Sequence, residues 1–497
     1  MSTYLMAFDQ GTTSSRTILF HPTGKAVSTA AERFTQHFPQ NGWVEHDAEE
    51  IFATQLKTAK EALAKAGATA DDIAAIGITN QRETVVVWEK ESGRPIAPAI
   101  VWQCRRTAEH CDELRRAGLE KTVREKTGLP IDPYFSATKL AWILANVPGA
   151  RERAERGELL FGTIDSFLIY RFTGGRVHAT DPSNASRTLL FNIHTMQWDE
   201  ELLRLFGIPA CMLPQVLPSA GLFGMTDAAI FGKEIPITGV AGDQQAALFG
   251  QCCFQEGDAK NTYGTGGFLL MQTGDTPIHS SHGLLTTVGW QIGKRVFYVL
   301  EGSVFICGAA IQWLRDGLGI LSSSGESETL ASSVPDTGGV YFVPALTGLG
   351  SPYWDPYARG TIVGLTRATT RAHLVRATLE AMAFQTTDLL EAMRCDVSFP
   401  LTTLRVDGGA AVNDLLLSFQ SDFSGLSIER PQCTESTALG AALLAGLGCG
   451  IFKDLAEVSV INTPEKRFVP SIDAIERERR LAAWHAAVEC ARHRIEL

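Results

Sequence analysis

The first apolar segments of the chain predict an antiparallel meander. Residues 4–9 and 16–20 are mainly apolar runs separated by a polar turn, and a second turn at 21–24 leads into a third run that ends at Phe34. Short apolar runs bounded by turn residues are typical of strands that pair with their neighbours in sequence. We therefore expect three strands that begin with a polar hairpin.

A change of period after Asp47 predicts an amphipathic helix. Apolar residues recur at helical spacing between Ile51 and Leu63. Asp47 is a typical N-cap and Gly67 a typical stop signal. The next apolar run, residues 76–80, is too short for a helix, and we expect a buried strand there.

The second half of the chain repeats this order of elements. A strand leads into the polar turn 261–267, and another strand, 404–409, ends in glycines. A helix at 413–423, a strand at 426–429 and a glycine- and alanine-rich helix from Ser436 continue the alternation. Such alternation favours a largely buried mixed or parallel sheet. The sequence thus predicts a duplicated α/β unit.

The length of the chain indicates two domains. At 497 residues it is too long for one core of ordinary size, so we expect a cleft between two domains. We place the boundary near residue 250, with domains at 1–250 and 251–497, joined by a hinge because no low-complexity linker is present. A composition with 45% hydrophobic residues and a net charge of −11 argues against a nucleic-acid partner.

Three features favour a reduced, cytoplasmic protein. Asp9 and Arg16 interrupt the segment in which a signal peptide would be apolar. The ten cysteines include no Cys-x-x-Cys pair, and the adjacent pair at 252–253 is better explained by packing than by a relaxed disulfide. The longest uncharged run, within 435–453, is short for a bilayer span and rich in glycine. We expect a closely packed helix there and no membrane insertion.

Phosphate binding is suggested by three glycine-rich turns that follow strands. The sequence has neither a Gly-x-x-x-x-Gly-Lys-Ser/Thr loop nor a His-Arg-Asp catalytic loop, so P-loop enzymes and protein kinases are not indicated. Hydroxyls and backbone N–H groups that could bind phosphate occur at Gly11–Ser14, at Tyr263–Gly267, and at Asp407–Ala410 with Asn413. Asp9 could hold Mg²⁺ directly or through water. Each turn alone could bind nothing, but the set favours a nucleotide between two domains.

A carboxylate after another strand is a candidate general base. Asp243 follows the apolar segment 235–240, and phosphoryl transfer needs a carboxylate within reach of the attacking hydroxyl. The alternative is a buried structural aspartate. A small polyol would need charged groups for its hydroxyls and flat apolar walls for its carbons. The candidates are Arg82, Glu83, Trp102, Tyr134 and Phe268. Singly, each of them is more often a core or surface residue.

Several longer motifs extend this pattern along the chain. They are Asp9–Arg16, Thr79–Glu83, Tyr134–Lys139 with Trp142, Gly242–Ala247, Tyr263–Gly266, Glu301–Trp313, Ser351–Asp355 and Gly360–Glu380. Together they resemble the FGGY family of carbohydrate kinases, within the actin and heat-shock-chaperone ATPase superfamily, and its glycerol kinases in particular. The resemblance implies two actin-like (ribonuclease H-like) α/β domains, each with a mixed central sheet, and an active site in the cleft between them.

The resemblance also implies a reaction and a role for each site residue. The chain would transfer the γ-phosphoryl group of ATP to glycerol in the first step of glycerol catabolism, with Mg²⁺ near Asp9 and Asp243 as the base. Glycerol would be hydrogen-bonded by Arg82, Glu83, Tyr134, Asp243 and Gln244, and its carbons covered by Trp102 and Phe268. The nucleotide would contact Thr12, Thr13, Ser14, Arg16, Thr265, Gly308, Gln312, Gly409 and Asn413.

One segment departs from the family pattern. Bacterial relatives regulated by fructose 1,6-bisphosphate carry a Gly-Gly-x-Arg loop, whereas Phe231–Glu234 here has an acidic residue where a phosphate-binding arginine is expected. We expect weak or absent inhibition by that sugar phosphate. Relatives are commonly dimers or tetramers, so a homodimer or homotetramer is expected. The C-terminal helix 472–491, a partner surface in some relatives, identifies no partner here.

Two other functions stay open. Another FGGY kinase, acting on a pentulose or an aldonate, would need a roomier pocket than Arg82, Glu83, Trp102 and Phe268 suggest. A non-catalytic nucleotide switch like actin would share the phosphate loops and the cleft, and fold alone does not exclude it. Such a switch would have no use for a polyol pocket, so ATP hydrolysis without glycerol would favour it.

Overall fold

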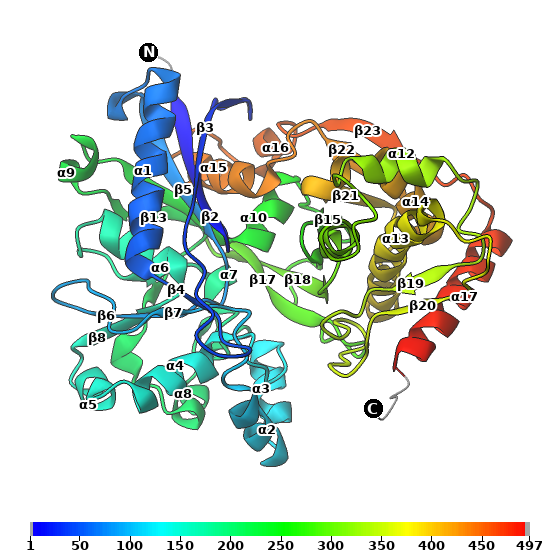
Figure 1. Cartoon of the computed structure of the whole chain (residues 1–497). Helices are drawn as coiled ribbons and strands as arrows, with labels where there is room; N and C mark the ends of the chain where they lie inside the picture. The colour runs from blue at the N-terminus through cyan, green and yellow to red at the C-terminus, as the bar shows by residue number, and fades with distance from the viewer. Residues whose placement is uncertain (1–2, 493–497) are drawn as a thin grey trace.

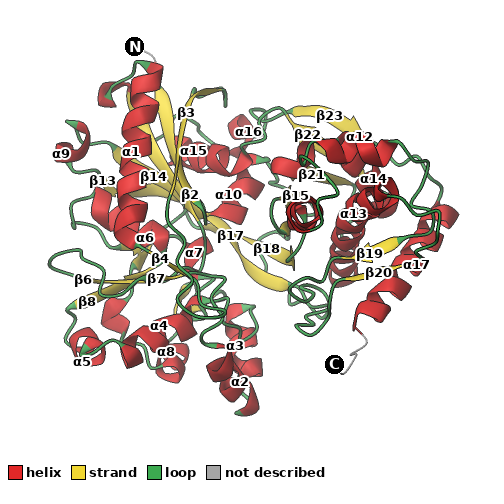
Figure 2. Ribbon diagram, viewed as in Figure 1, coloured by secondary structure: helices red, strands yellow, loops and turns green. Residues whose placement is uncertain are grey.

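The computed structural model describes residues 3–492 of the chain (Figures 1 and 2). Most strands form one sheet of thirteen, in the order β23-β22-β21-β15-β16-β18-β17-β13-β14-β5-β1-β2-β3. Their bounds are β1 Tyr4–Gln10, β2 Ser14–Phe20, β3 Ala26–Arg33, β5 Ile73–Asn80, β13 Ala220–Met225, β14 Pro236–Gly242, β15 Ala259–Tyr263, β16 Gly267–Gln272, β17 Leu285–Ile292, β18 Arg295–Val304, β21 Thr403–Asp407, β22 Ser427–Pro431 and β23 Pro464–Phe468.

Helices and short two-stranded sheets surround this large sheet. The helices include α1 Ala48–Ala66, α4 Ser136–Asn146, α7 Pro182–Ala185, α9 Ala228–Phe231, α10 Asp243–Gly250, α11 Gly308–Gln312, α13 Arg371–Asp396, α14 Asp414–Ser424, α15 Ser436–Gly448 and α17 Ala474–Arg492. The short sheets pair β4 Glu45–His46 with β7 Ala99–Ile100, β6 Val86–Glu89 with β8 Leu159–Gly162, β9 Ala179–Thr180 with β12 Gln215–Val216, β10 Phe191–Asn192 with β11 Gln197–Trp198, and β19 Tyr341–Val343 with β20 Thr361–Val363.

The large sheet consists of two half-sheets with one repeated strand pattern. In the N-terminal half-sheet, β2 is antiparallel to β1 and β3, and β1, β5 and β14 run parallel. In the C-terminal half-sheet, β16 is antiparallel to β15 and β18, and β15, β21 and β22 run parallel. The predicted meander and duplicated α/β unit are thus confirmed. The half-sheets join through the pairing of Ala220 in β13 with Ile292 in β17, which the sequence did not indicate.

Helix α1 forms for the reasons that its sequence gives. The Asp47 side chain accepts a hydrogen bond from the backbone N–H of Glu49, which would otherwise lack a partner in the first turn. Gly67 ends the helix in the left-handed conformation at φ 62°, which glycine adopts without steric cost. The buried face, which includes Ile51 and Leu63, packs against β2 and β3.

Helices α10 and α15 pack against each other at the centre of the molecule (Figure 1). Their backbones approach so closely that a Cβ at Gly440 would lie 1.8 Å from the carbonyl oxygen of Ala246. Helix α15 also covers the N-terminal half-sheet, because a Cβ at Gly77 of β5 would lie 2.1 Å from the carbonyl oxygen of Ala441. The predicted close packing of this small-residue helix is confirmed. Within residues 3–492, no helix is both long and apolar enough to span a bilayer.

Candidate active site

Two adjacent parallel strands bring the predicted base and the predicted acceptor-binding pair together. Strand β5 ends at Asn80, shortly before Arg82 and Glu83, and β14 ends at Gly242, directly before Asp243. The carboxyl ends of parallel strands are the usual place for ligand sites in α/β folds. Glu83 has a φ of 60°, which is uncommon for a residue other than glycine and indicates a constrained backbone.

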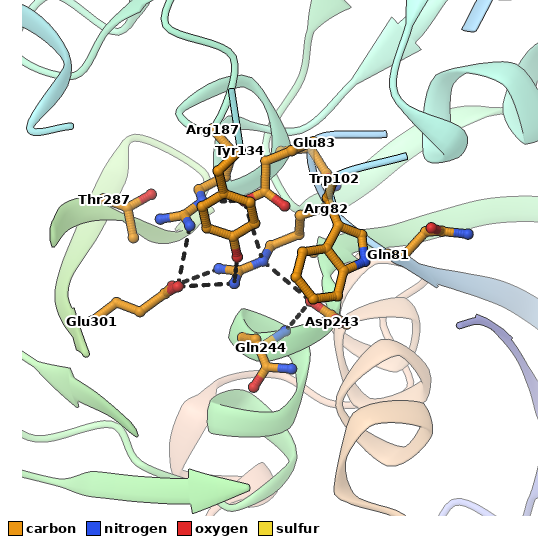
Figure 3. A network of polar contacts seen from close by, with 12 residues as sticks. Gln81, Arg82, Glu83, Trp102, Tyr134, Arg187, Asp243, Gln244, Thr287 and Glu301 are labelled. Carbon is orange, nitrogen blue, oxygen red and sulfur yellow. Dashed lines mark hydrogen bonds and ion pairs between the residues drawn. The ribbon is translucent and has the colours of Figure 1, made fainter. Parts of the chain in front are cut away.

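Arg82 is the centre of a charged network (Figure 3). Its side chain is 2% exposed, and its Nη1 and Nη2 donate to the two carboxylate oxygens of Glu301 at 2.6 and 2.9 Å. Its Nε lies 3.2 Å from Oδ1 of Asp243, whose side chain is 31% exposed. Nη2 also donates to the Tyr134 hydroxyl at 3.3 Å. Asp243 is therefore the most accessible charged group of the network, whose arginine and glutamate side chains are buried.

A second arginine, Arg187, completes the network. Its Nε donates to Glu83 at 2.6 Å and its Nη2 donates to Glu301 at 3.1 Å. Arg187 and Glu301 have no exposed side-chain surface. Two arginines thus balance two fully buried glutamates, as charges in a low-dielectric interior require.

The pKa values of the carboxyl groups differ because their partners differ. Burial opposes the ionisation of Glu301, but Arg187 and Arg82 outweigh it and lower its pKa to about 2. Burial raises the pKa of Asp243 above its ordinary value, and Arg82 offsets this only in part. Glu301 is therefore a fixed anion, whereas Asp243 has the higher proton affinity that suits a general base.

Aromatic rings cluster beside the charged network. The Trp102 ring lies edge-on to Tyr134 at 5.6 Å between centroids and to Phe268 at 6.5 Å. Phe268 comes from β16, in the C-terminal half-sheet, so the two halves of the molecule supply opposite parts of the wall. The predicted combination of flat apolar surfaces and charged groups is present at one place.

A buried lysine connects this pocket to the glycine-rich turns. Lys260 of β15 donates to Oε1 of Gln244 at 2.6 Å and to the Thr262 hydroxyl at 2.8 Å. Thr262 in turn donates to Asp407 of β21 at 2.6 Å. Burial lowers the pKa of Lys260 to about 8, although Asp407 opposes the shift. The chain of contacts runs from α10 to the ends of β15 and β21.

The glycine-rich turns of the C-terminal half-sheet lie side by side. The backbone N–H of Gly308, at the start of α11, donates to the carbonyl oxygen of Gly264 at 2.9 Å. Gly408 has a φ of 88°, and a Cβ there would lie 2.6 Å from the carbonyl oxygen of Tyr263. Of the residues predicted for the nucleotide, Thr265, Gln312 and Gly409 are exposed and Gly308 is half-buried. Asn413 is buried and caps α14 through a bond from the N–H of Leu416.

The turn after β1 lies beside the acceptor pocket. Nε1 of Trp102 donates to the Thr12 hydroxyl at 3.0 Å, while Thr13 is exposed and Ser14 is half-buried. Arg16 donates to Oδ2 of Asp9 at 2.6 Å and forms an ion pair with Glu435, just before α15, at 2.5 Å. Glu435 thus joins the predicted phosphate-binding turn to the second half of the chain.

Sequence reasoning gave no role to three charged residues of the site: Arg187, Lys260 and Glu301, the last of which begins one of the motifs. Arg187 follows the short helix α7 and carries no motif of its own. Glu301 follows an apolar run in its strand that predicts ordinary core, and Lys260 lies in a strand of mixed polarity. A charge in the middle of such an apolar strand is the one available signal, because buried charges occur where they are paired.

Comparison with known proteins identifies the class of this protein. Models of the FGGY family of carbohydrate kinases match it twice, the N-terminal domain at residues 4–250 and the C-terminal domain at residues 259–449. The chain belongs to the FGGY family of carbohydrate kinases, and it is a kinase with the expected two-domain actin-like α/β fold.

Similar proteins with specific names extend over nearly the whole chain. Glycerol kinase 2 of Thermotoga maritima is 58% identical over 485 residues, and the glycerol kinase of Symbiobacterium thermophilum is 60% identical over 489, each covering 98% of both chains. The crystal structure of Plasmodium falciparum glycerol kinase with ADP has a TM-score of 0.93 and 34% identity, covering 99% of each chain. A xylulose kinase of Lactobacillus acidophilus, at 22% identity and TM-score 0.86 over 98% of this chain and 97% of its own, shares the fold.

Proposed function

We propose that this kinase phosphorylates glycerol, transferring the γ-phosphoryl group of ATP to give sn-glycerol 3-phosphate and ADP. The observation that carries the proposal is the position of Asp243, the accessible carboxylate 3.2 Å from buried Arg82 and beside the pocket formed by Trp102, Tyr134 and Phe268. The near full-length likeness to proteins named glycerol kinase supports the same acceptor.

In the proposed reaction Asp243 accepts the proton of the attacking hydroxyl. Arg82, Glu83, Tyr134 and Gln244 hydrogen-bond the glycerol hydroxyls, and Trp102 and Phe268 cover its carbons. This division suits a triol, which has a polar group on every carbon and only a narrow apolar edge. Positioning of the hydroxyl in line with the phosphorus, together with electrostatic stabilisation of the phosphoryl group, supplies most of the rate enhancement in phosphoryl transfer.

The glycine-rich turns are proposed to bind ATP. Their exposed backbone can approach phosphate oxygens closely because glycine has no Cβ. The proposed contacts are Thr12, Thr13, Ser14, Arg16, Thr265, Gly308, Gln312, Gly409 and Asn413. Mg²⁺ would neutralise charge on the phosphates near Asp9, whose carboxylate oxygen is a ligand type that Mg²⁺ accepts. Both bonds from Arg16 to Asp9 go to Oδ2, so Oδ1 suits the ion or its water.

Other properties of the enzyme belong to the same proposal. We propose a cytoplasmic protein, because none of the ten cysteines forms a disulfide. We also propose a homodimer or homotetramer, and two domains divided near residue 250 that close on the substrates and exclude water.

An assay of product and base together tests the proposal. Purified protein with MgATP and glycerol is expected to form sn-glycerol 3-phosphate, identified by NMR or by a stereospecific dehydrogenase. Asp243→Asn keeps the shape of the side chain but removes its basicity, so kcat should fall by about 100-fold or more. Asp258→Asn, in a turn before β15, is the matched control. Unchanged turnover in Asp243→Asn would disprove the role of the base.

A further inference from the structure

Glu301 lies where the C-terminal half-sheet reaches into the acceptor pocket. It belongs to β18, which pairs with β16 and β17, and its side chain is 0% exposed. Burying an ionised carboxylate costs several kcal/mol unless its partners compensate fully. Glu301 receives two bonds from Arg82 and one from Arg187, so it holds two arginines at once (Figure 3).

Arg187 connects Glu301 to Glu83, which follows β5 of the N-terminal half-sheet. The preceding residue, Ser186, hydrogen-bonds the Thr287 hydroxyl of β17 at 2.6 Å, which fixes the chain at this point. The Arg187 guanidinium carbon also lies 5.4 Å from the centroid of the Tyr134 ring. Arg187 is therefore fixed by a strand, a ring and two carboxylates before any ligand binds.

This arrangement decides which atoms of the acceptor-binding pair face the ligand. Because Glu301 occupies both terminal nitrogens of Arg82, the Nε of Arg82 is left pointing at Asp243, 3.2 Å away. Arg187 donates to the Glu83 carboxylate at 2.6 Å and so fixes the side chain of a residue whose backbone is already constrained at φ 60°. Neither Glu301 nor Arg187 needs to touch the acceptor to have these effects.

We propose that Glu301 and Arg187 are a positioning pair that sets acceptor affinity by fixing Arg82 and Glu83. The proposal rests on the proposed glycerol kinase function and deepens it. The C-terminal half-sheet would thus contribute to acceptor recognition through charge, beyond the ring of Phe268. Arg82 and Glu83 are then only half of the recognition unit, and the unit is complete only when the two half-sheets are joined.

The pair also affects the charge around the base. Asp243 faces Arg82 and Lys260, and behind Arg82 lie Glu301, Glu83, Tyr134 and Arg187. Glu301 partly cancels the positive field of the arginines at Asp243. Removing that negative charge would favour the ionised form of Asp243 and lower its pKa. The acid limb of the pH profile of kcat/KM should then move to lower pH, which a purely structural defect would not cause.

The test compares Glu301→Gln and Arg187→Lys with a matched control. Gln keeps the shape of Glu301 without its charge, and Lys keeps the charge of Arg187 without its planar fork. Glu429→Gln is the control, since Glu429 is also a buried carboxylate between two arginines, Arg405 and Arg467, but lies on β22, four strands from β18. Thermal unfolding is recorded for every variant.

The KM for glycerol should rise about ten- to hundredfold in Glu301→Gln and Arg187→Lys, as loss of hydrogen bonds between charged groups implies, and the KM for MgATP should stay within about twofold. Glu301→Gln should also show the acid limb at lower pH. An unchanged KM for glycerol, or a change that Glu429→Gln shares, would overturn the proposal.

The test also covers a variant that does not fold and an enzyme that rejects glycerol. If Glu301→Gln does not fold, Arg187→Lys tests the proposal by the same comparison of the KM for glycerol with the KM for MgATP. If the unmodified enzyme rejects glycerol, the proposed function fails, and the same variants are measured with the carbohydrate that it accepts. An unchanged KM for that carbohydrate would then overturn the positioning role separately.

Discussion

The acceptor pocket and the nucleotide-binding turns differ in what carries their chemistry. The pocket is built from buried charged side chains, with Arg82, Arg187, Glu83 and Glu301 at most 3% exposed. The turns are built from backbone, with Thr265 and Gly409 exposed and Gly308 bonded through its N–H. A small uncharged polyol offers only hydroxyls, so its site must supply fixed polar groups. A nucleotide carries its own charges, which backbone N–H groups can bind together with a few polar side chains.

The largest expected effect comes from breaking the charged network. Arg82→Met leaves Glu301 and Asp243 without their main partner, and removing one member of a buried ion pair costs about 3–5 kcal/mol of stability. We expect kcat/KM for glycerol to fall by at least about 100-fold, since bonds to charged groups are lost. The KM for MgATP should change far less. Steady-state kinetics and thermal unfolding check this, with the exposed Arg467→Met as control.

A backbone clash in the nucleotide-binding turns should affect the KM for MgATP more than the KM for glycerol, the reverse of Arg82→Met. In Gly308→Ala the new Cβ would lie 2.6 Å from the carbonyl oxygen of Gly264, so the two turns must separate. We expect the KM for MgATP to rise about tenfold, as loss of one or two hydrogen bonds implies, with little change in the KM for glycerol. In Gly409→Ala no protein atom lies within 4 Å of the new Cβ. A higher KM for MgATP in this variant would therefore indicate direct contact between residue 409 and the nucleotide. Equal changes in both KM values for Gly308→Ala would contradict the separation of the two regions.

Substitution of Trp102 should have a smaller effect on KM, which extends to both the acceptor pocket and the nucleotide-binding turns. Trp102→Phe keeps an aromatic wall but loses the bond from Nε1 to the Thr12 hydroxyl. One neutral hydrogen bond contributes about 0.5–1.5 kcal/mol, so we expect the KM values for glycerol and MgATP each to rise by about two- to fivefold. Thr12→Val removes the same bond from the other side. If the two variants differ strongly in their effect on the KM for MgATP, Thr12 contacts the nucleotide by itself.

The smallest expected effect is that of fructose 1,6-bisphosphate. In the segment after α9, Lys233 pairs with Asp71 at 2.7 Å and Glu234 pairs with Arg176 at 3.1 Å. Asp71 thus offsets part of the charge of Lys233, and the carboxylate of Glu234 repels a phosphate. We expect the rate with glycerol and MgATP to change by less than about a tenth at millimolar sugar phosphate. Inhibition at micromolar concentrations would disprove this.

The sequence predicted the parts of the fold that follow from local periodicity. The meander, the caps of α1 at Asp47 and Gly67, and the helix from Ser436 are where the pattern puts them. The pattern could not reveal that α15 covers the N-terminal half-sheet, because Gly77 and Gly440 become contact points only once distant segments meet. Tertiary packing of this kind has no local signal.

For the site, the motifs predicted roles for the polar residues at strand ends. They predicted no role for the buried charged residues that pair with them. Arg82 and Asp243 lie in turns after strands, where polar residues are conspicuous. Glu301 and Lys260 lie within β18 and β15, and their partners come from elsewhere in the chain. The roles of the predicted residues toward glycerol, ATP and Mg²⁺ stay predictions.

The acceptor selectivity of the unmodified enzyme tests the proposed glycerol kinase activity most directly. ADP release with MgATP would be measured without acceptor and with glycerol, D-xylulose or gluconate. We predict release that depends on glycerol, with kcat/KM at least about 100-fold above that for either larger acceptor, because fixed charged groups that hydrogen-bond a small triol discriminate against acceptors that leave them unpaired. ADP release without any acceptor, or a preference for xylulose or gluconate, would contradict the proposal that the enzyme phosphorylates glycerol.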